Sequence, residues 1–156
     1  HGVAAPLDLA LDGFLDGAVI DRPVSARGAL EPVLRLFGAD LVASGGRLQG
    51  RGRGAQGVRA LDPGELAVVA DEPVLQLVRA QETELPRQMT LAFIDGEADY
   101  RRAAVASRRL AGASGREARA EVAAVLRRDQ AQALADAWLQ DVWAAREGAR
   151  FALSPR

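Results

Sequence analysis

The chain has 156 residues with a net charge of −1, and 49% of them are hydrophobic against 26% charged. This composition is typical of a globular chain rather than a disordered one, and we expect residues 1–156 to form a single domain. There is no cysteine, which excludes disulfides, thiol nucleophiles and Cys-ligated metal sites. The one histidine is His1, so a catalytic triad or a His-based metal site would need a frayed terminus. No stretch of residues reaches the ~20 apolar positions of a membrane helix.

Charge is spread unevenly along the chain. Residues 1–21 hold four Asp and no base, whereas residues 100–128 hold eight Arg and two Glu, a balance of +6. Such asymmetry indicates either a partner surface or a solvated strand face. Because the first residue is His rather than Met, we also expect the chain to be a processed or excised piece of a larger protein.

The first third of the chain predicts short strands, one helix and one hairpin. Residues 7–20 contain two Asp-Gly pairs, which favour irregular chain or short edge strands. A helix is expected over 25–37, with Ser25 as its N-cap and Gly38 just beyond its end. Pro32 should kink it or shorten its first turn. The apolar stripe of this helix consists of Leu30, Val33, Leu34 and Phe37.

A hairpin should follow the first helix. Residues 39–43 and 47–51 flank Ser44-Gly45-Gly46, whose two glycines suit the positive φ angles of a tight turn. The next stretch, 50–57, alternates Gly with Arg. It resembles an RNA-binding box, but one short copy without aromatic neighbours favours a mobile loop.

The middle of the chain is predicted to be β-rich. Asp95-Gly96 is expected to close a hairpin onto a strand over 98–107. Helix and strand compete over 116–126, where the alternation of small apolar with charged residues favours a strand. Three further strand-length runs, bounded by Pro or Asp-Gly, cover residues 65–70, 74–81 and 88–94.

The last helix is expected over 129–147, starting with a capping box between Asp129 and Gln132 and stopped by Gly148. A final strand is predicted at 151–153. Trp143 lies at the flank of the apolar arc and is interpreted either as a core residue or as an interface anchor. The apolar face of this helix is predicted to consist of Ala131, Leu134, Ala135, Trp138, Val142 and Ala145.

Acidic pairs are the only candidates for chemistry in this sequence. Two pairs of aspartates lie four residues apart, Asp12 with Asp16 and Asp95 with Asp99. Each pair supplies too few oxygen ligands for a calcium loop, and turns explain both pairs better. Glu82 and Glu84 lie two apart on a predicted strand, as a general acid/base pair would. The glycine spacings match no phosphate-binding or dinucleotide motif. We therefore expect no catalytic residue, no cofactor and no metal site.

Several linear stretches resemble a known family. They are DRPVSAR at 21–27, ALEP at 29–32, RAQETELP at 79–86, DYRRAAV at 99–105, and AWLQ with AAREG within 137–148. The chain is similar here to the phage tail protein family, in particular to the tail-hub proteins of gene transfer agents, which are related to phage host-specificity tail-tip proteins. These matches span residues 20 to 153. They identify a family and not a reaction.

The resemblance implies a structural role in a phage-like tail particle, which would be assembled in the bacterial cytoplasm. Expected partners are other copies of the protein, as a trimer at full length, together with tail tube and baseplate proteins. DNA would pass through the assembly without specific binding, and no membrane anchor is implied. The family offers no catalytic residues to carry over onto this segment. Residues proposed for a protein interface are Trp143, Tyr100, Arg101 and Arg102.

We thus predict an α+β fold, a mainly antiparallel sheet or open barrel with two packed amphipathic helices, 25–37 and 129–147. The predicted function is that of a structural module of a tail hub. Two alternatives from other classes stay open. One is a nucleic-acid-contacting module that uses the arginines of 101–128, although Tyr100 is the single aromatic near them. The other is a cell-wall hydrolase domain, for which Glu82 and Glu84 would be the pair to test.

Overall fold

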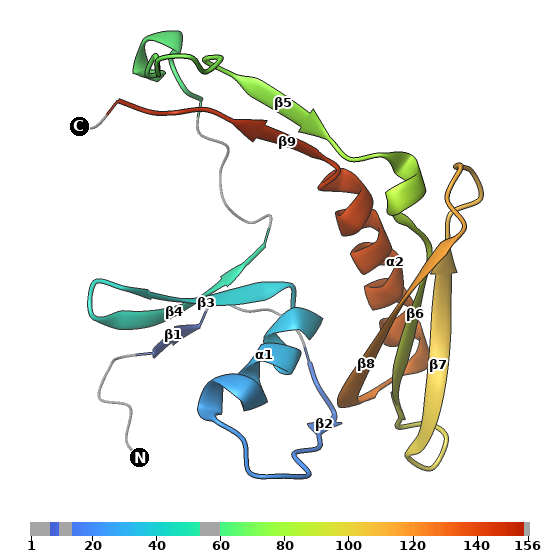
Figure 1. Ribbon diagram of the computed structural model, residues 1–156. Coiled ribbons are helices and arrows are strands. Elements are labelled where there is room, and N and C mark those ends of the chain that lie inside the picture. Colours follow the sequence, from blue (N-terminus) through green and yellow to red (C-terminus); the bar gives the residue numbers. More distant parts are fainter. Residues whose placement is uncertain (1–6, 10–13, 54–59, 155–156) are drawn as a thin grey trace.

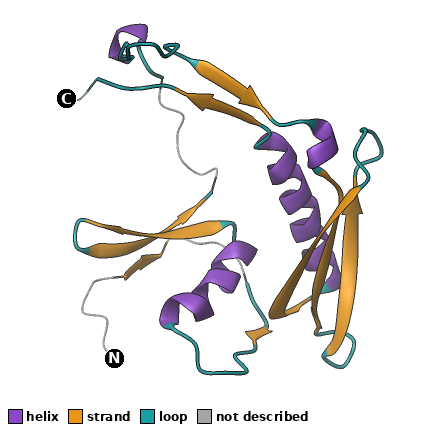
Figure 2. Cartoon of the chain, viewed as in Figure 1, coloured by secondary structure: helices purple, strands orange, loops and turns teal. Residues whose placement is uncertain are grey.

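A computed structural model describes residues 7–9, 14–53 and 60–154 (Figure 1). Within these ranges the chain forms three small sheets and two α-helices, as the colouring of Figure 2 shows. The pairings are mostly antiparallel, and none of the three sheets closes into a barrel. The predicted α+β class is therefore confirmed in its open form.

The largest sheet has the strand order β2-β8-β6-β7. Its strands are β2 (Gly17–Ala18), β8 (Arg116–Leu126), β6 (Pro86–Asp95) and β7 (Arg101–Arg108). β6 and β7 form an antiparallel hairpin, and residues 109–115 then lead back to the start of β6, so that β8 runs parallel to β6. The bounds of β8 are those predicted from its alternation, so the strand interpretation of 116–126 is confirmed.

One face of this sheet is covered by α2 (Arg128–Ala144), as Figure 1 shows. The inward residues of β6 are the alternate ones, Met89, Leu91 and Phe93, as the pattern predicted. Leu91 and Phe93 pack with the alanines of α2, whose small side chains let the helix lie close to the strands. Fully buried contacts at this interface come from Leu91, Leu126, Ala131 and Ala135.

The buried face of α2 is rotated from the predicted one. Trp143 is only 7% exposed and packs with Leu85, Met89 and Leu139, whereas Trp138 is half-buried between the two hydrophobic clusters. The indole N–H of Trp143 donates to the carbonyl of Pro86 at 2.8 Å. The predicted apolar face was therefore wrong beyond Ala135, because four-residue spacing from Ala131 leads to Leu139 and Trp143 rather than to Trp138 and Val142.

The N-terminal part confirms the predicted helix and hairpin. In α1 (Ala26–Leu36) the Ser25 hydroxyl accepts from the backbone N–H of Gly28 at 3.1 Å, and Gly38 has a φ of 55° beyond the end of the helix. Leu36 joins the core of the large sheet. The hairpin of β3 (Ala39–Ser44) and β4 (Arg47–Gly52) turns at two glycines with φ of 58° and 73°. β1 (Leu7–Leu9) adds to β4 in parallel, a short edge strand as expected.

A two-stranded ribbon completes the fold. It pairs β5 (Gln76–Arg79) with β9 (Glu147–Arg150), which continues directly from α2, and it projects past that helix in Figure 1. The 3₁₀ turns η1 (Pro63–Glu65) and η2 (Glu82–Glu84) lie before and after β5. The ribbon joins the rest of the molecule where the Ala80 N–H donates to the carbonyl of Arg146 at 2.8 Å.

Four predicted strands and loops of the chain need correction. Residues 65–70 form no strand beyond one bridge from Leu66 to Leu153, because Asp62 caps η1 and its side chain competes with a strand ladder. The strand predicted over 74–81 shortens to β5. β7 begins at 101 rather than 98, because the turn after Asp95 extends to residue 100. Residues 50–52 of the predicted mobile loop belong to β4, and its residues 54–57 lie outside the described ranges.

Both ends of α2 also differ from prediction. The helix begins at Arg128, which places Asp129 inside the first turn and prevents a capping box; the Gln132 amide donates instead to Ala106 and Asp136. The helix ends at Ala144, and Gly148 pairs with Val78 inside β9 instead of stopping the helix. The final strand therefore covers 147–150 rather than 151–153.

One exposed ion pair ties the hairpin together. Arg53, just after β4, donates to both carboxylate oxygens of Asp40 on β3, at 2.9 Å and 2.7 Å. This two-point hydrogen bond, with the guanidinium charge beside it, lowers the pKa of Asp40. The carboxylate in turn raises the pKa of Arg53.

The rotated face of α2 leads to a stability prediction. Trp143→Ala should lower the free energy of unfolding by about 3–5 kcal/mol, because it removes a buried ring and leaves a cavity. Trp138→Ala, at a half-buried position, is the matched control and should cost clearly less. Trp143→Phe should cost about 1 kcal/mol or more, since it leaves the Pro86 carbonyl without its donor. Urea unfolding of the three variants measures this, and equal losses for the two Ala variants would contradict the assignment.

The Asp40–Arg53 pair leads to a titration prediction. The carboxyl of Asp40 should titrate below the usual range of an aspartate, and Arg53→Gln should bring its pKa back up. Any stability from the pair is present above the ordinary pKa of Asp and is lost as the pH falls through the lowered one. Carboxyl NMR titration of both chains tests this. An unchanged Asp40 midpoint in the variant would show that the pair does not persist in solution.

Candidate protein interface

The turn between β6 and β7, together with the first two residues of β7, holds three of the four residues predicted for an interface. Asp95 ends β6, is 4% exposed, and accepts from the backbone N–H of Glu97 at 3.0 Å. The guanidinium of Arg128 lies 3.8 Å from the other carboxylate oxygen of Asp95. The turn is closed further by a hydrogen bond from the Gly96 N–H to the carbonyl of Leu126. Its base is thus held by both β8 and the first turn of α2.

The end of this turn is conformationally strained. Asp99 and Tyr100 both have left-handed backbones, with φ of 51° and 56°. Two consecutive residues other than Gly in this region are unusual, and a bulky aromatic there is a genuine outlier. The Tyr100 side chain is 70% exposed.

Two arginines follow Tyr100 on β7. Arg102 pairs across the sheet with Glu121 of β8 at 2.9 Å, and Arg101 forms no ion pair with any described residue. An exposed aromatic next to arginine side chains is the composition that protein interfaces enrich. We refer to Tyr100, Arg101 and Arg102 as the Tyr100 tip.

The fourth predicted interface residue, Trp143, lies elsewhere. It contacts Pro86 at the start of β6, the end of the sheet opposite to the Tyr100 tip, and it is buried. The Arg109 guanidinium stacks 4.0 Å from its ring centroid. Of the two interpretations of Trp143, the structure matches the core residue.

The arginines of residues 100–128 do not form a continuous basic face. Those that pair with acidic residues are Arg102, Arg119, Arg127 and Arg128. Arg109 stacks on Trp143, while Arg108 and Arg116 lie together at the start of β6 and Arg101 lies at its end. A stretch of nucleic acid would need these charges in one track, and the sheet separates them.

The acidic pairs are explained by local structure where they are described. Glu82 and Glu84 lie on η2 instead of a strand face, and Glu82 pairs with Arg146 at 2.9 Å. Asp95 and Asp99 belong to the β6–β7 turn, and Asp12 lies outside the described residues. The described ranges contain no group of three acidic or His side chains that could hold a metal ion. They also contain no helix that is long and apolar enough to span a membrane.

Sequence reasoning missed a groove between α1 and the β3–β4 hairpin. Its volume is about 450 Å³, and its walls combine leucines with the Asp40–Arg53 pair. The apolar lining consists of Leu30, Leu34, Leu41 and Leu48. The leucines of α1 were predicted to form an apolar stripe with Val33 and Phe37, but the buried residue of this helix is Leu36, which is 7% exposed. The signal available in the sequence was Gly38, which ends the helix and turns the chain back so that the hairpin faces it.

Comparisons with known proteins agree with the resemblance. The family described as "Putative phage tail protein" matches residues 25–156. A chain of the solved structure "Virion of native gene transfer agent (GTA) particle" is similar, with a TM-score of 0.74 and 33% sequence identity. That match covers 83% of this chain and 29% of the other, so this chain spans under a third of that protein. A search of curated proteins gives no match. From the family match over most of its length, the chain belongs to the phage tail protein family.

Proposed function

We propose that the chain is a structural module of the tail hub of a phage-like particle, making subunit–subunit and hub–tube contacts. The observation that carries this proposal is the likeness, at 33% identity and a TM-score of 0.74, to a chain of a gene transfer agent virion. Family membership supports a role in a tail. Its place would then be the tail particle, and its partners other copies of itself together with tube and baseplate proteins.

The surface of the described residues suits such contacts better than catalysis. The Tyr100 tip is exposed and strained, and the carboxylates that could act in acid/base chemistry are in turns or ion pairs. A residue held in a costly conformation at the surface needs a compensating use. We therefore assign the Tyr100 tip to a contact with another tail subunit, in a role that is not enzymatic.

Assembly is the first test of the proposal. A closed ring repeats one contact between neighbours, and association costs several kcal/mol of translational and rotational freedom. A longer protein containing this segment should form a stable ring, most simply three-fold, while the 156-residue chain should be monomeric or weakly associated. Light scattering on both measures this. A longer protein that is monomeric at micromolar concentration and absent from purified particles would contradict the hub assignment.

Substitution at the Tyr100 tip separates contact from stability. Tyr100→Gly removes the aromatic but suits the positive φ, so the free energy of unfolding should hold or rise by up to about 1 kcal/mol. Incorporation of the protein into tail particles should fall at the same time. Asp99→Gly is the matched control, because it relieves the same kind of strain and keeps the tyrosine. Normal incorporation of the Tyr100→Gly protein into tail particles would show that the Tyr100 tip is not part of the interface.

A further inference from the structure

The ribbon of β5 and β9 has no core of its own. We refer to residues 60–79 and 147–154 as the arm. None of its residues is buried, and none belongs to either hydrophobic cluster of buried residues. Large apolar side chains nevertheless lie at its surface, with Val68 82% and Leu77 76% exposed. Others in the arm are Val69, Val74, Leu75, Val78, Phe151 and Leu153.

Such an arm is not expected to be stable alone. An isolated two-stranded ribbon is marginal in water, because ordering its backbone costs about 1–2 kcal/mol per residue and little apolar area is buried in return. Contiguous exposed apolar side chains also mark interaction sites. The arm shown at the top of Figure 1 therefore needs a covering surface.

The charge of the arm indicates which kind of partner surface can cover it. Residues 60–79 contain four acidic residues and one base, Arg79, which pairs with Glu147 of the neighbouring strand at 3.3 Å. On the paired strand, Glu147 and Arg150 cancel in charge. The partner surface should therefore be basic with an apolar element, as complementary interfaces are.

The same chain carries a surface of that description. Arg108 ends β7 and Arg116 begins β8, and residues 108–116 between them contain no acidic residue. Arg87 joins them from β6, where its Nε donates to the carbonyl of Arg109. Leu110 projects from the connecting loop and is 92% exposed. We refer to Arg87, Leu110 and the three arginines 108, 109 and 116 as the basic end.

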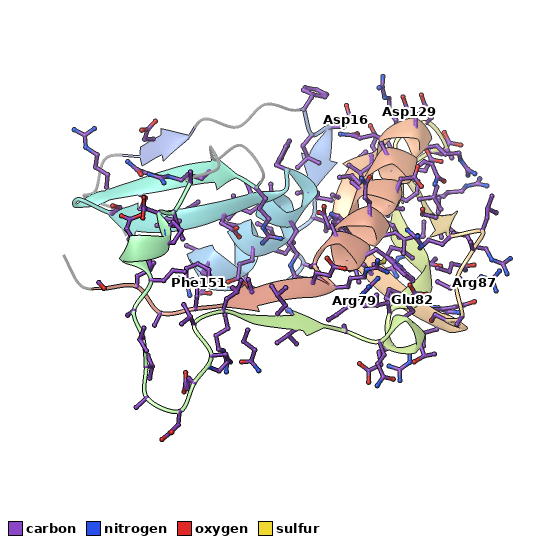
Figure 3. All side chains as sticks on the ribbon, turned by 90° about the horizontal axis from the view of Figure 1, so that it is seen from above. Asp16, Arg79, Glu82, Arg87, Asp129 and Phe151 are labelled. Carbon is purple, nitrogen blue, oxygen red and sulfur yellow. The ribbon has the colours of Figure 1, made fainter. Side chains whose placement is uncertain are left out.

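The arm and the basic end of one molecule point apart. Figure 3 places Phe151 of the arm and Arg87 of the basic end at opposite sides of the view, and Figure 1 likewise separates the far end of the arm from the β7–β8 loop. Neither Arg108 nor Arg116 forms an ion pair with any described residue of its own chain. The two complementary surfaces can therefore meet only between molecules.

We propose that the arm of one copy docks on the basic end of a second copy, head to tail. The proposal rests on the subunit–subunit contact of the proposed function and names the two surfaces that make it. Val68, Val69 and Leu77 would pack near Leu110, while Asp71 and Glu72 would face Arg108 and Arg116. Because the two patches differ, a docked pair still has one free arm and one free basic end, and the contact repeats into a ring or a filament.

Engineered disulfides test this contact in the full chain, which has no native cysteine. The double variant Val69→Cys with Leu110→Cys should form a ladder of disulfide-linked dimers and higher species under mild oxidation. Val69→Cys with Ala133→Cys, whose second position is exposed on α2, is the matched control. The arm–Leu110 pair should exceed this control at least tenfold in cross-linked yield. Raising the salt concentration should lower that yield, since the charges are exposed.

A charge exchange completes the experiment. Two charge-reversed variants of the cysteine pair are compared. One carries Asp71→Arg with Glu72→Arg on the arm, and the other carries Arg108→Glu with Arg116→Glu on the basic end. Each variant alone should give a cross-linked yield at least fivefold lower. Mixing the two reversed chains should restore it. Equal yields for the two cysteine pairs, or no restoration on mixing, would overturn the head-to-tail contact and leave the arm to another partner. These outcomes test only the contact between copies of the chain. The hub assignment has a separate test, because it would be overturned by absence of the protein from tail particles.

Discussion

The packing of α2 against the large sheet is the contact on which the rest of the molecule depends. Its alanines allow a close approach to β6, and the Trp143 indole bonds to the Pro86 carbonyl at 2.8 Å. Trp143 thereby fixes the C-terminal half of the helix at the start of β6. The arm leaves from the same place, since the Ala80 N–H donates to Arg146 just beyond the helix. The direction of the arm and the position of the basic end are therefore both consequences of how this helix packs.

The two ends of the large sheet have different physical characters. At one end, the β6–β7 turn stores backbone strain at Asp99 and Tyr100 above a buried, hydrogen-bonded Asp95. At the other end, Arg109 covers Trp143, and Arg108 and Arg116 face solvent. Under the proposed function, surfaces of different chemistry on opposite ends of one sheet would keep separate subunit contacts from competing.

Local sequence signals were sufficient wherever neighbouring residues decide the conformation. The Ser25 cap, the Gly38 stop and the Gly45-Gly46 turn act through hydrogen bonds and φ angles within a few residues. The alternation of β8 likewise predicted its bounds, because the more buried face alternates with an exposed one up to Ala124, before Val125 and Leu126 are both buried. The linear stretches that resemble the phage tail family also lie in the sequence itself, and the family match over 25–156 confirms them.

Tertiary structure decided what depends on distant partners. The apolar arc of α2 is broad, so either Trp138 or Trp143 satisfied its period, and only the Pro86 carbonyl and the cluster around Met89 selected Trp143. Gly148 looked like a helix stop, yet pairing with Val78 drew it into a strand. By itself the sequence determined the class of fold, the Ser25-capped helix with its following hairpin, and the family. The arm, the groove beside α1 and the separation of the arginines came from the tertiary structure, because each is made by residues far apart in the chain.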